Sequence, residues 1–354
     1  MLCLFPKADQ ERTTFPMAVA DDKGSKTRLF SLDGYTTDRL HVDSTITSTL
    51  NWDYGRRDGR LWSLYEKSKT SQWNATTDID WSPEVRFGSP LSAEASAGAA
   101  PFASAPGSPV PRELWDEFRW EYQAWMVSQF LHGEQGALVT TARLVEIVPD
   151  LEAKTYAAAQ VADEARHVEA YARYIDEKLG VCYPINQGLK QLLCELLTES
   201  RWDIVYLGMQ VVVEGLALAA FRVSSGFGDP LITSITKAIA RDEARHVSFG
   251  AIALTGLYPE MTSVELAERE AFLLEAIHLM SQRFMLREVW GNMGLNVAAG
   301  VRFARTDPMM IAFRQLLFYK VVQMLRQVGL LTPRIMDLLV SESLVRSCPM
   351  EESV

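Results

Sequence analysis

From Pro111 onward, apolar residues recur three and four positions apart, which is the spacing of a helix that buries one face. No alternating strand pattern of any length follows residue 111. Prolines and glycines divide the pattern, because proline favours the first turn of a helix and glycine commonly follows the last. We expect helices over residues 111–148, 151–178, 187–223, 229–258, 263–291, 308–328 and 333–344.

The chain before Pro111 has a different character. Leu61 to Lys67 has the spacing of a short helix, between turn-rich pieces. Ala, Ser, Gly and Pro dominate residues 91–111, which offer little apolar surface to offset the entropy of ordering. We therefore expect four parts, which are an irregular segment packing on a bundle, a linker, a helical bundle, and further helices completing the same domain: residues 1–90, 91–111, 112–258 and 259–354.

Within the helical region a hexapeptide occurs twice. Asp163–Val168 reads DEARHV, and Asp242–Val247 repeats it letter for letter. Each copy contains Glu-x-x-His, and residues three apart lie on the same face of a helix. Each copy therefore presents one carboxylate and one imidazole together. These four residues are Glu164, His167, Glu243 and His246.

A lone glutamate precedes each copy inside an apolar stretch. Glu134 lies 30 residues before Glu164, and Glu214 lies 29 residues before Glu243. Four glutamates and two Glu-x-x-His histidines are the ligand set of a dinuclear metal site in a four-helix bundle. Burying four carboxylates together without cations would be very costly. Oxygen and imidazole ligands without thiolate suit iron or manganese.

The residues that flank each Glu-x-x-His have a supporting role in this interpretation. Ligating histidines usually donate their second ring N–H to a carboxylate or carbonyl. Asp163 and Asp242 are candidates for that role, acting across the bundle, and Arg166 and Arg245 would pair with them and keep them ionised.

Composition excludes several other classes of protein. A net charge of −10 and a pI near 5.2 argue against nucleic acid and against an anionic membrane as partners. We find no uninterrupted apolar run of membrane-spanning length and no signal peptide. Four scattered cysteines fit a reducing cytoplasm. No dinucleotide-binding glycine motif or P-loop is present, so electrons would come from a separate donor or from the substrate.

In these motifs the chain resembles the ferritin-like di-iron carboxylate proteins, over about residues 112–256. The doubled Asp-Glu-x-Arg-His is most similar to the hydroxylase subunits of bacterial multicomponent monooxygenases. It is also similar to the ribonucleotide reductase small subunit and to acyl-carrier-protein desaturases. The resemblance implies an all-α, ferritin-like four-helix bundle, two iron ions or a Mn/Fe pair, and dioxygen as co-substrate. It implies six ligands, which are Glu134, Glu164, His167, Glu214, Glu243 and His246.

Two positions can be compared with functional residues of these relatives, and one of them differs. Leu218 stands where the multicomponent monooxygenases have a threonine linked to oxygen activation, so proton handling would need another donor. Tyr171 stands where the reductase small subunit has its radical tyrosine, although tyrosine is also common in helix interfaces. Phe221 and Phe249 are candidates to line a pocket near the metals, with core packing as the simpler interpretation. Residues 65–82 resemble an N-terminal segment that wraps the bundle in related oxygenases.

The favoured hypothesis is a non-haem di-iron oxygenase that hydroxylates, N-oxygenates or desaturates a small organic substrate, free or bound to a carrier. Its electrons would come from an external donor such as a ferredoxin or a reductase. Two alternatives stay open, which are a radical or ligand-binding oxidase like the reductase small subunit, and ferritin-like iron handling. A homodimer is expected from the frequency of twofold oligomers. The sequence does not identify the substrate.

Overall fold

The computed structural model describes residues 39–55, 59–85, 87, 107–224 and 229–346, and the regular structure within these ranges is entirely helical. The predicted all-α class is confirmed. Most of the expected linker, residues 91–106, lies outside the described residues. So do residues 1–38, 56–58 and 88–90 of the expected N-terminal segment, residues 225–228 after the third predicted helix, and residues 347–354. The predicted division into parts therefore stays a prediction.

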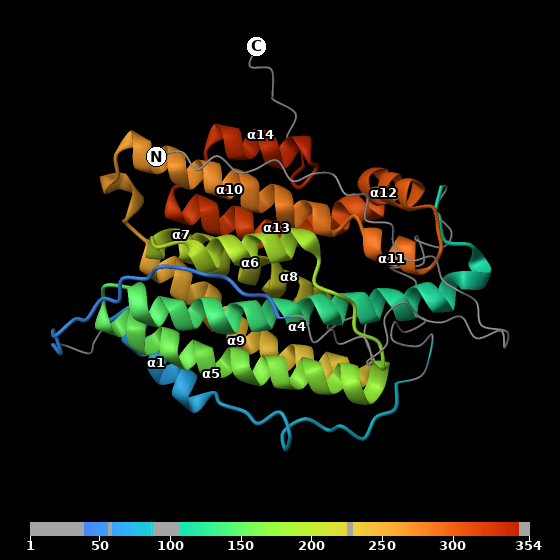
Figure 1. Cartoon of the computed structure of the whole chain (residues 1–354), viewed down its shortest axis with the longest axis horizontal. Coiled ribbons are helices and arrows are strands. Elements are labelled where there is room, and N and C mark those ends of the chain that lie inside the picture. The colour runs from blue at the N-terminus through green and yellow to red at the C-terminus, as the bar shows by residue number, and fades with distance from the viewer. Residues whose placement is uncertain (1–38, 56–58, 86, 88–106, 225–228, 347–354) are drawn as a thin grey trace, which may run out of the picture.

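Four helices form the central bundle (Figure 1). After the short 3-10 turn η2 (Arg112–Leu114), α4 (Trp115–Ile147) and α5 (Leu151–Tyr174) pack along each other, and α8 (Glu214–Ser224) packs on α9 (Pro230–Leu254). The two pairs meet where α5 packs on α9. Asp229 begins α9 as its side chain accepts from the N–H groups of the next turn, with Pro230 at the first position.

The predicted single helix over residues 187–223 is wrong. The structure has α6 (Gln187–Thr198), a break, and then α7 (Trp202–Tyr206) continuing through a π-helical stretch η4 (Leu207–Val213) into α8. Side chains satisfy the backbone at the break, so no glycine or proline marks it. The Glu199 carboxylate accepts the N–H groups of Ser200 and Arg201, each at 2.8 Å, and Arg143 donates to the carbonyls of Glu199 and Leu197.

The C-terminal helices cover one side of the bundle (Figure 1). They are α10 (Ser263–Arg283), α11 (Arg287–Asn292), α12 (Val297–Thr306), α13 (Pro308–Val328) and α14 (Pro333–Ser341). A short 3-10 turn, η5 (Tyr258–Glu260), precedes them. The expected continuous helix over 263–291 is wrong, because Leu286 adopts a left-handed backbone with φ of 54° between α10 and α11. The helix α12 was not predicted. The helix α13 packs on α8, and α10 packs on α6 and η4.

One helix from the N-terminal region also joins the bundle. The spacing from Leu61 to Lys67 predicted a short helix, and α1 (Arg60–Thr70) confirms it. The helix α1 packs against both α5 and α9, beneath them in Figure 1. We call the residues that follow it, 71–85, the strap.

The hydrophobic core has two clusters, and each central helix contributes to both. On α4, Trp125 belongs to one cluster and Leu144 to the other. On α5, Tyr156 and Tyr171 are divided in the same way. On α4 and α5, buried polar side chains lie between these positions, and on α9 Asp242, Glu243 and His246 lie between the residues of the two clusters. A polar layer therefore separates the two apolar clusters at mid-bundle. At its far end α5 runs into a π-helical turn, η3 (Ile175–Leu179), which ends at Gly180 with φ of 64°.

One stretch has the length and mean hydropathy of a membrane span, although polar residues interrupt its apolar run. This stretch is Trp202–Arg222, and 83% of its most apolar window is buried inside the bundle. Burial among other helices is the setting of a core helix in a soluble protein.

Candidate metal centre

The polar layer contains all six residues that the repeat singled out. Glu134 comes from α4, Glu164 and His167 from α5, Glu214 from the first position of α8, and Glu243 and His246 from α9. Each of them is at most 5% exposed. Residues from four helices and two sequence repeats therefore meet in one buried place.

The His167 imidazole faces three of the glutamates. Its Nδ1 lies 3.1 Å from Glu134 Oε2, 3.4 Å from Glu164 Oε2 and 3.3 Å from Glu243 Oε1. These four residues form a group whose donor atoms all lie within 4.8 Å of one another. Three carboxylates and one imidazole nitrogen can surround one cation at this distance.

The His246 imidazole repeats the arrangement. Its Nδ1 lies 3.2 Å from Glu164 Oε1, 3.4 Å from Glu243 Oε1 and 3.9 Å from Glu214 Oε2. Glu164, Glu214 and His246 form a second compact donor group. Glu164 and Glu243 therefore approach both histidines, whereas Glu134 and Glu214 each approach one.

The chemistry of these donors fits cations better than hydrogen bonds. Among the described residues, Glu164 Oε2, Glu214 Oε2, Glu243 Oε2 and His246 Nδ1 are buried without a hydrogen-bond partner. Burial and then the neighbouring carboxylates raise the pKa of Glu214 well above its ordinary value. Burial is likewise the main cause that raises the pKa of Glu134, against the opposing charge of His167. Carboxylate oxygens and imidazole nitrogens that converge in this way suit two divalent ions.

On the side facing away from the glutamates, each histidine contacts an aspartate of the other repeat. His167 Nε2 lies 3.1 Å from Asp242 Oδ2, and His246 Nε2 lies 3.3 Å from Asp163 Oδ2. Burial alone would raise the pKa of Asp242, but hydrogen bonding to His167 and the charge on that ring outweigh burial and lower it. His246 lowers the pKa of Asp163 in the same way. Ionised aspartates accept from Nε2–H, which orients each ring with Nδ1 directed inward toward the glutamates.

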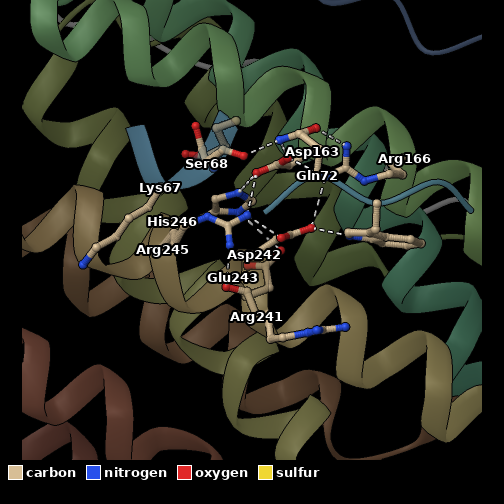
Figure 2. Close-up of polar contacts among 12 residues, drawn as sticks. Lys67, Ser68, Gln72, Asp163, Arg166, Arg241, Asp242, Glu243, Arg245 and His246 are labelled. Atoms are coloured by element: carbon tan, nitrogen blue, oxygen red, sulfur yellow. Dashed lines mark hydrogen bonds and ion pairs between the residues drawn. The ribbon is translucent and has the colours of Figure 1, made fainter. Parts of the chain in front are cut away.

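Two arginines close a ring around these aspartates (Figure 2). Arg166 pairs with Asp163 of its own repeat and lies 3.2 Å from Asp242, while Arg245 pairs with Asp242 and lies 3.3 Å from Asp163. Each guanidinium therefore bridges both repeats. The two positive and two negative charges in this ring offset each other next to the inner glutamates.

The strap covers this outer ring. Trp73 Nε1 donates to Asp242 Oδ2 at 2.7 Å, and the Trp73 ring lies 5.1 Å from the Arg166 guanidinium. Gln72 Nε2 donates to Asp163 Oδ1 at 3.1 Å, and its Oε1 accepts from Arg166 at 2.6 Å (Figure 2). The sequence suggested a wrap for residues 65–82, but it did not indicate which side chains reach the site.

A buried amide was missed by the sequence analysis. Gln160 is fully buried, and its Nε2 donates to Glu164 Oε1 at 2.9 Å and to Glu214 Oε1 at 2.6 Å. It precedes Glu164 by four residues, so helical spacing alone places it on the same face of α5. That spacing was the available signal.

The four candidate pocket residues lie on both sides of the polar layer. Tyr171 and Phe221 belong to one apolar cluster, with ring centroids 6.2 Å apart, and Phe130 contacts both. Leu218 and Phe249 belong to the other cluster, where Phe249 packs 4.4 Å from the ring of Tyr156. Burial, followed by the charges of Glu134 and Glu243, raises the pKa of Tyr171 well above its ordinary value. Tyr171 therefore lies close enough to the carboxylates to feel their charge.

A helical bundle whose core brings together two Glu-x-x-His pairs and two further glutamates belongs to the class of ferritin-like carboxylate metalloproteins. The family model of the p-aminobenzoate N-oxygenase AurF, a ferritin-like di-iron oxygenase, matches residues 144–329, which is more than half of the chain. The chain belongs to this AurF family. Its general activity is that of an oxygen-dependent di-iron oxidoreductase.

Solved structures also resemble the chain. One variant of an R2-like ligand-binding oxidase with a Mn/Fe cofactor is 18% identical, with a TM-score of 0.45 over 77% of this chain and 95% of that chain. A second variant is 19% identical, with a TM-score of 0.44 over 78% and 94%. At this similarity the likeness carries no argument about function. No curated protein matches the chain.

Proposed function

We propose that this chain is a di-iron N-oxygenase that oxidises the amino nitrogen of a small aromatic amine. The observation that carries the proposal is the arrangement of six buried donors around two histidines, with Glu164 and Glu243 near both. Membership of an N-oxygenase family selects nitrogen oxidation among the three reactions left open by the sequence. A relative's substrate, p-aminobenzoate, is the first compound to test.

Glu134 and His167 would hold one iron, Glu214 and His246 would hold the other, and Glu164 and Glu243 lie near enough to both histidines to serve either ion. When bound, the two iron ions would supply the electrons that activate dioxygen. Asp163 and Asp242 keep each imidazole oriented with Nδ1 inward, and Arg166 and Arg245 keep those aspartates ionised.

An aromatic layer next to Glu134 is suited to an aryl substrate. Phe130 lies one helical turn before Glu134, and its ring meets Phe221 edge-on with centroids 4.8 Å apart. Tyr171 completes this layer. Rings of this kind receive another ring in offset or edge-on contact and exclude water. The layer would therefore position an arylamine with its nitrogen directed toward the carboxylates.

We also propose an electron donor, a cellular location and an oligomeric state for this chain. Reduction of the iron would need an external donor, such as a ferredoxin or a reductase, since the sequence carries no flavin or nicotinamide motif. A reducing cytoplasm is the proposed location, because a ferrous site and scattered cysteines suit it. A homodimer is proposed from the frequency of twofold assemblies.

The test begins with metal content and then examines product. Protein reconstituted anaerobically with ferrous ion should hold about two irons per chain, the content of a dinuclear bundle site. After reduction, exposure to ¹⁸O₂ and p-aminobenzoate should yield hydroxylamino and nitro products that carry ¹⁸O by mass spectrometry. Protein that binds no metal under these conditions contradicts the proposal. Accumulation of a mineral iron core without product would favour iron handling instead.

One observation favours a second candidate, a radical or ligand-binding oxidase with Fe/Fe or Mn/Fe. Tyr171 is fully buried, and its pKa is raised by burial and by nearby Glu134 and Glu243. A stable tyrosyl signal in electron paramagnetic resonance after oxygen exposure, lost in Tyr171→Phe, would support this candidate. Tyr174→Phe, which removes another buried tyrosine of α5, is the matched control. Equal metal loading in both variants is required for the comparison.

A further inference from the structure

The amide of Gln160 contacts one glutamate that approaches a single histidine, Glu214, and one that approaches both, Glu164. Its Nε2 carries two hydrogens, and it donates to Glu214 Oε1 at 2.6 Å and to Glu164 Oε1 at 2.9 Å. In both carboxylates the second oxygen, Oε2, has no hydrogen-bond partner among the described residues. Glu214 Oε2 instead lies 3.9 Å from Nδ1 of His246. The amide thus leaves one oxygen of Glu214 directed toward the histidine.

In the part of the chain that the structure describes, the other half of the site has no equivalent amide. Gln160 precedes Glu164 by four residues, and the residue four before Glu243 in the second repeat is Ile239, which is fully buried and apolar. Among the described residues, the carboxylate of Glu134 has one hydrogen-bond partner, Nδ1 of His167 at 3.1 Å. The pseudo-twofold symmetry of the repeats is therefore broken at this position.

We propose that Gln160 makes the two metal positions inequivalent by fixing Glu214 as a ligand that binds through one oxygen. This inference rests on the proposed dinuclear site. A carboxylate with one oxygen held by an amide cannot rotate to present both oxygens without breaking that hydrogen bond. The position of Glu214 and His246 is then preorganised, and the position of Glu134 and His167 is the one whose carboxylate is free to change its binding mode.

This asymmetry also assigns a side to the substrate. The aromatic layer of Phe130, Tyr171 and Phe221, where we propose that the substrate lies, includes the side chain one helical turn before Glu134. The proposed substrate and the Glu134 position would then lie on the same side of the centre. Gln160 acts as a positioning residue, because it reaches the metals only through Glu164 and Glu214.

The test is to measure the stepwise binding of ferrous ion to the full chain by titration calorimetry under anaerobic conditions. Gln160→Met keeps the length of the side chain and removes the amide. In Q160M one of the two binding steps should weaken by about 10–100-fold, the usual cost of removing a group that orients a ligand. The other step should stay within about twofold. Ile239→Met makes the matched change at the equivalent position, and it should leave both steps unchanged.

A double-mutant cycle assigns the affected step. The effect of Q160M should be much smaller in the Glu214→Ala background, and it should persist in full in the Glu134→Ala background, because coupled residues are not additive. Circular dichroism of metal-free protein checks that each variant folds. Gln160→Asn, which keeps the amide but shortens its reach, is a second variant that should reproduce the loss.

Several outcomes would overturn the inference. Wild-type protein that binds two ions while Q160M leaves both steps unchanged, or weakens both equally, contradicts the role of Gln160 and leaves the dinuclear site intact. Coupling of Q160M to Glu134 rather than to Glu214 would also contradict it. Wild-type protein that binds no ferrous ion would overturn the dinuclear site itself, and the role of Gln160 with it.

Discussion

Oδ2 of Asp242 lies 3.1 Å from Nε2 of His167, although the two residues come from different copies of the repeat. The reciprocal pair, Asp163 and His246, lies at 3.3 Å. Each repeat therefore orients the histidine of the other, and the two halves of the site depend on each other. We expect Asp242→Asn to lower ferrous affinity by about 10–100-fold, because the amide no longer supplies a charged acceptor to the ring. Calorimetric titration of metal-free protein measures this change.

The control for Asp242→Asn is Asp116→Asn. Asp116 pairs with Arg119 on the surface of α4, far along the helix from Glu134, so its loss should leave metal affinity unchanged. Equal affinities in D242N and wild type would contradict the proposed role of the aspartates.

Substituting a glutamate that approaches both histidines should remove more iron than substituting one that approaches a single histidine. Glu164 approaches both histidines, so Glu164→Ala should reduce iron from about two per chain toward none, whereas Glu214→Ala should retain about one. Inductively coupled plasma mass spectrometry on reconstituted protein gives the counts. Identical losses in the two variants would show that Glu164 is not shared. Glu195→Ala, a partly buried glutamate on α6, serves as the control.

Metal binding should release protons. Burial favours neutral histidine, but Glu134 at His167 and Glu164 at His246 outweigh it and raise the pKa of both rings well above the ordinary value. Both imidazoles of the metal-free protein therefore hold a proton at neutral pH, which a metal must displace. Affinity should rise with pH until the raised pKa values are passed, and fall in acid. Titration calorimetry in two buffers of different ionisation enthalpy counts the protons.

The same shift acts on the stability of the metal-free fold. A histidine pKa raised in the folded state stabilises that state most fully below the ordinary histidine pKa, and the stabilisation is lost as pH rises through the raised value. Metal-free protein should therefore unfold at lower denaturant concentration at alkaline pH than at neutral pH.

Metal uptake without proton release would contradict the assignment of protonated rings, on which both of these predictions depend.

The attachment of the strap to the bundle should depend on the indole of Trp73. Trp73 donates to Asp242 at 2.7 Å and lies over Arg166. Trp73→Phe keeps a ring but loses the hydrogen bond to a charged group, which is worth about 1.5–3 kcal/mol. We expect faster proteolysis within residues 71–85 and a lower free energy of unfolding in urea. Trp52→Phe alters an indole that is 71% exposed, and it should change neither.

The sequence predicted the parts of this molecule that depend on helical spacing. The doubled DEARHV and the upstream Glu134 and Glu214 located six side chains that the fold brings together, because i and i+3 share a helix face whatever surrounds them. The predicted helix limits at residues 178 and 229 lie next to Gly180 and Asp229, because a glycine with positive φ and an N-cap before proline have local causes.

Features that depend on distant partners were not predictable in this way. The break at Glu199 is satisfied by Arg143 from another helix, and the turn at Leu286 requires a backbone conformation that leucine rarely adopts. The contacts of Gln72 and Trp73 join residues 91 and 169 positions apart in sequence. Spacing along one helix contains no information about such pairs.

The polar layer between the two apolar clusters has a consequence for cooperativity. If two cations occupy this layer, as proposed, they would join four helices at mid-length, and we expect the clusters around Leu144 and Trp125 to melt together as one unit. Without cations, carboxylate oxygens stay buried at the junction without hydrogen-bond partners among the described residues, and we expect the two ends of the bundle to open separately. Iron supply would then set both the chemical competence of the protein and the lifetime of its chain against proteases.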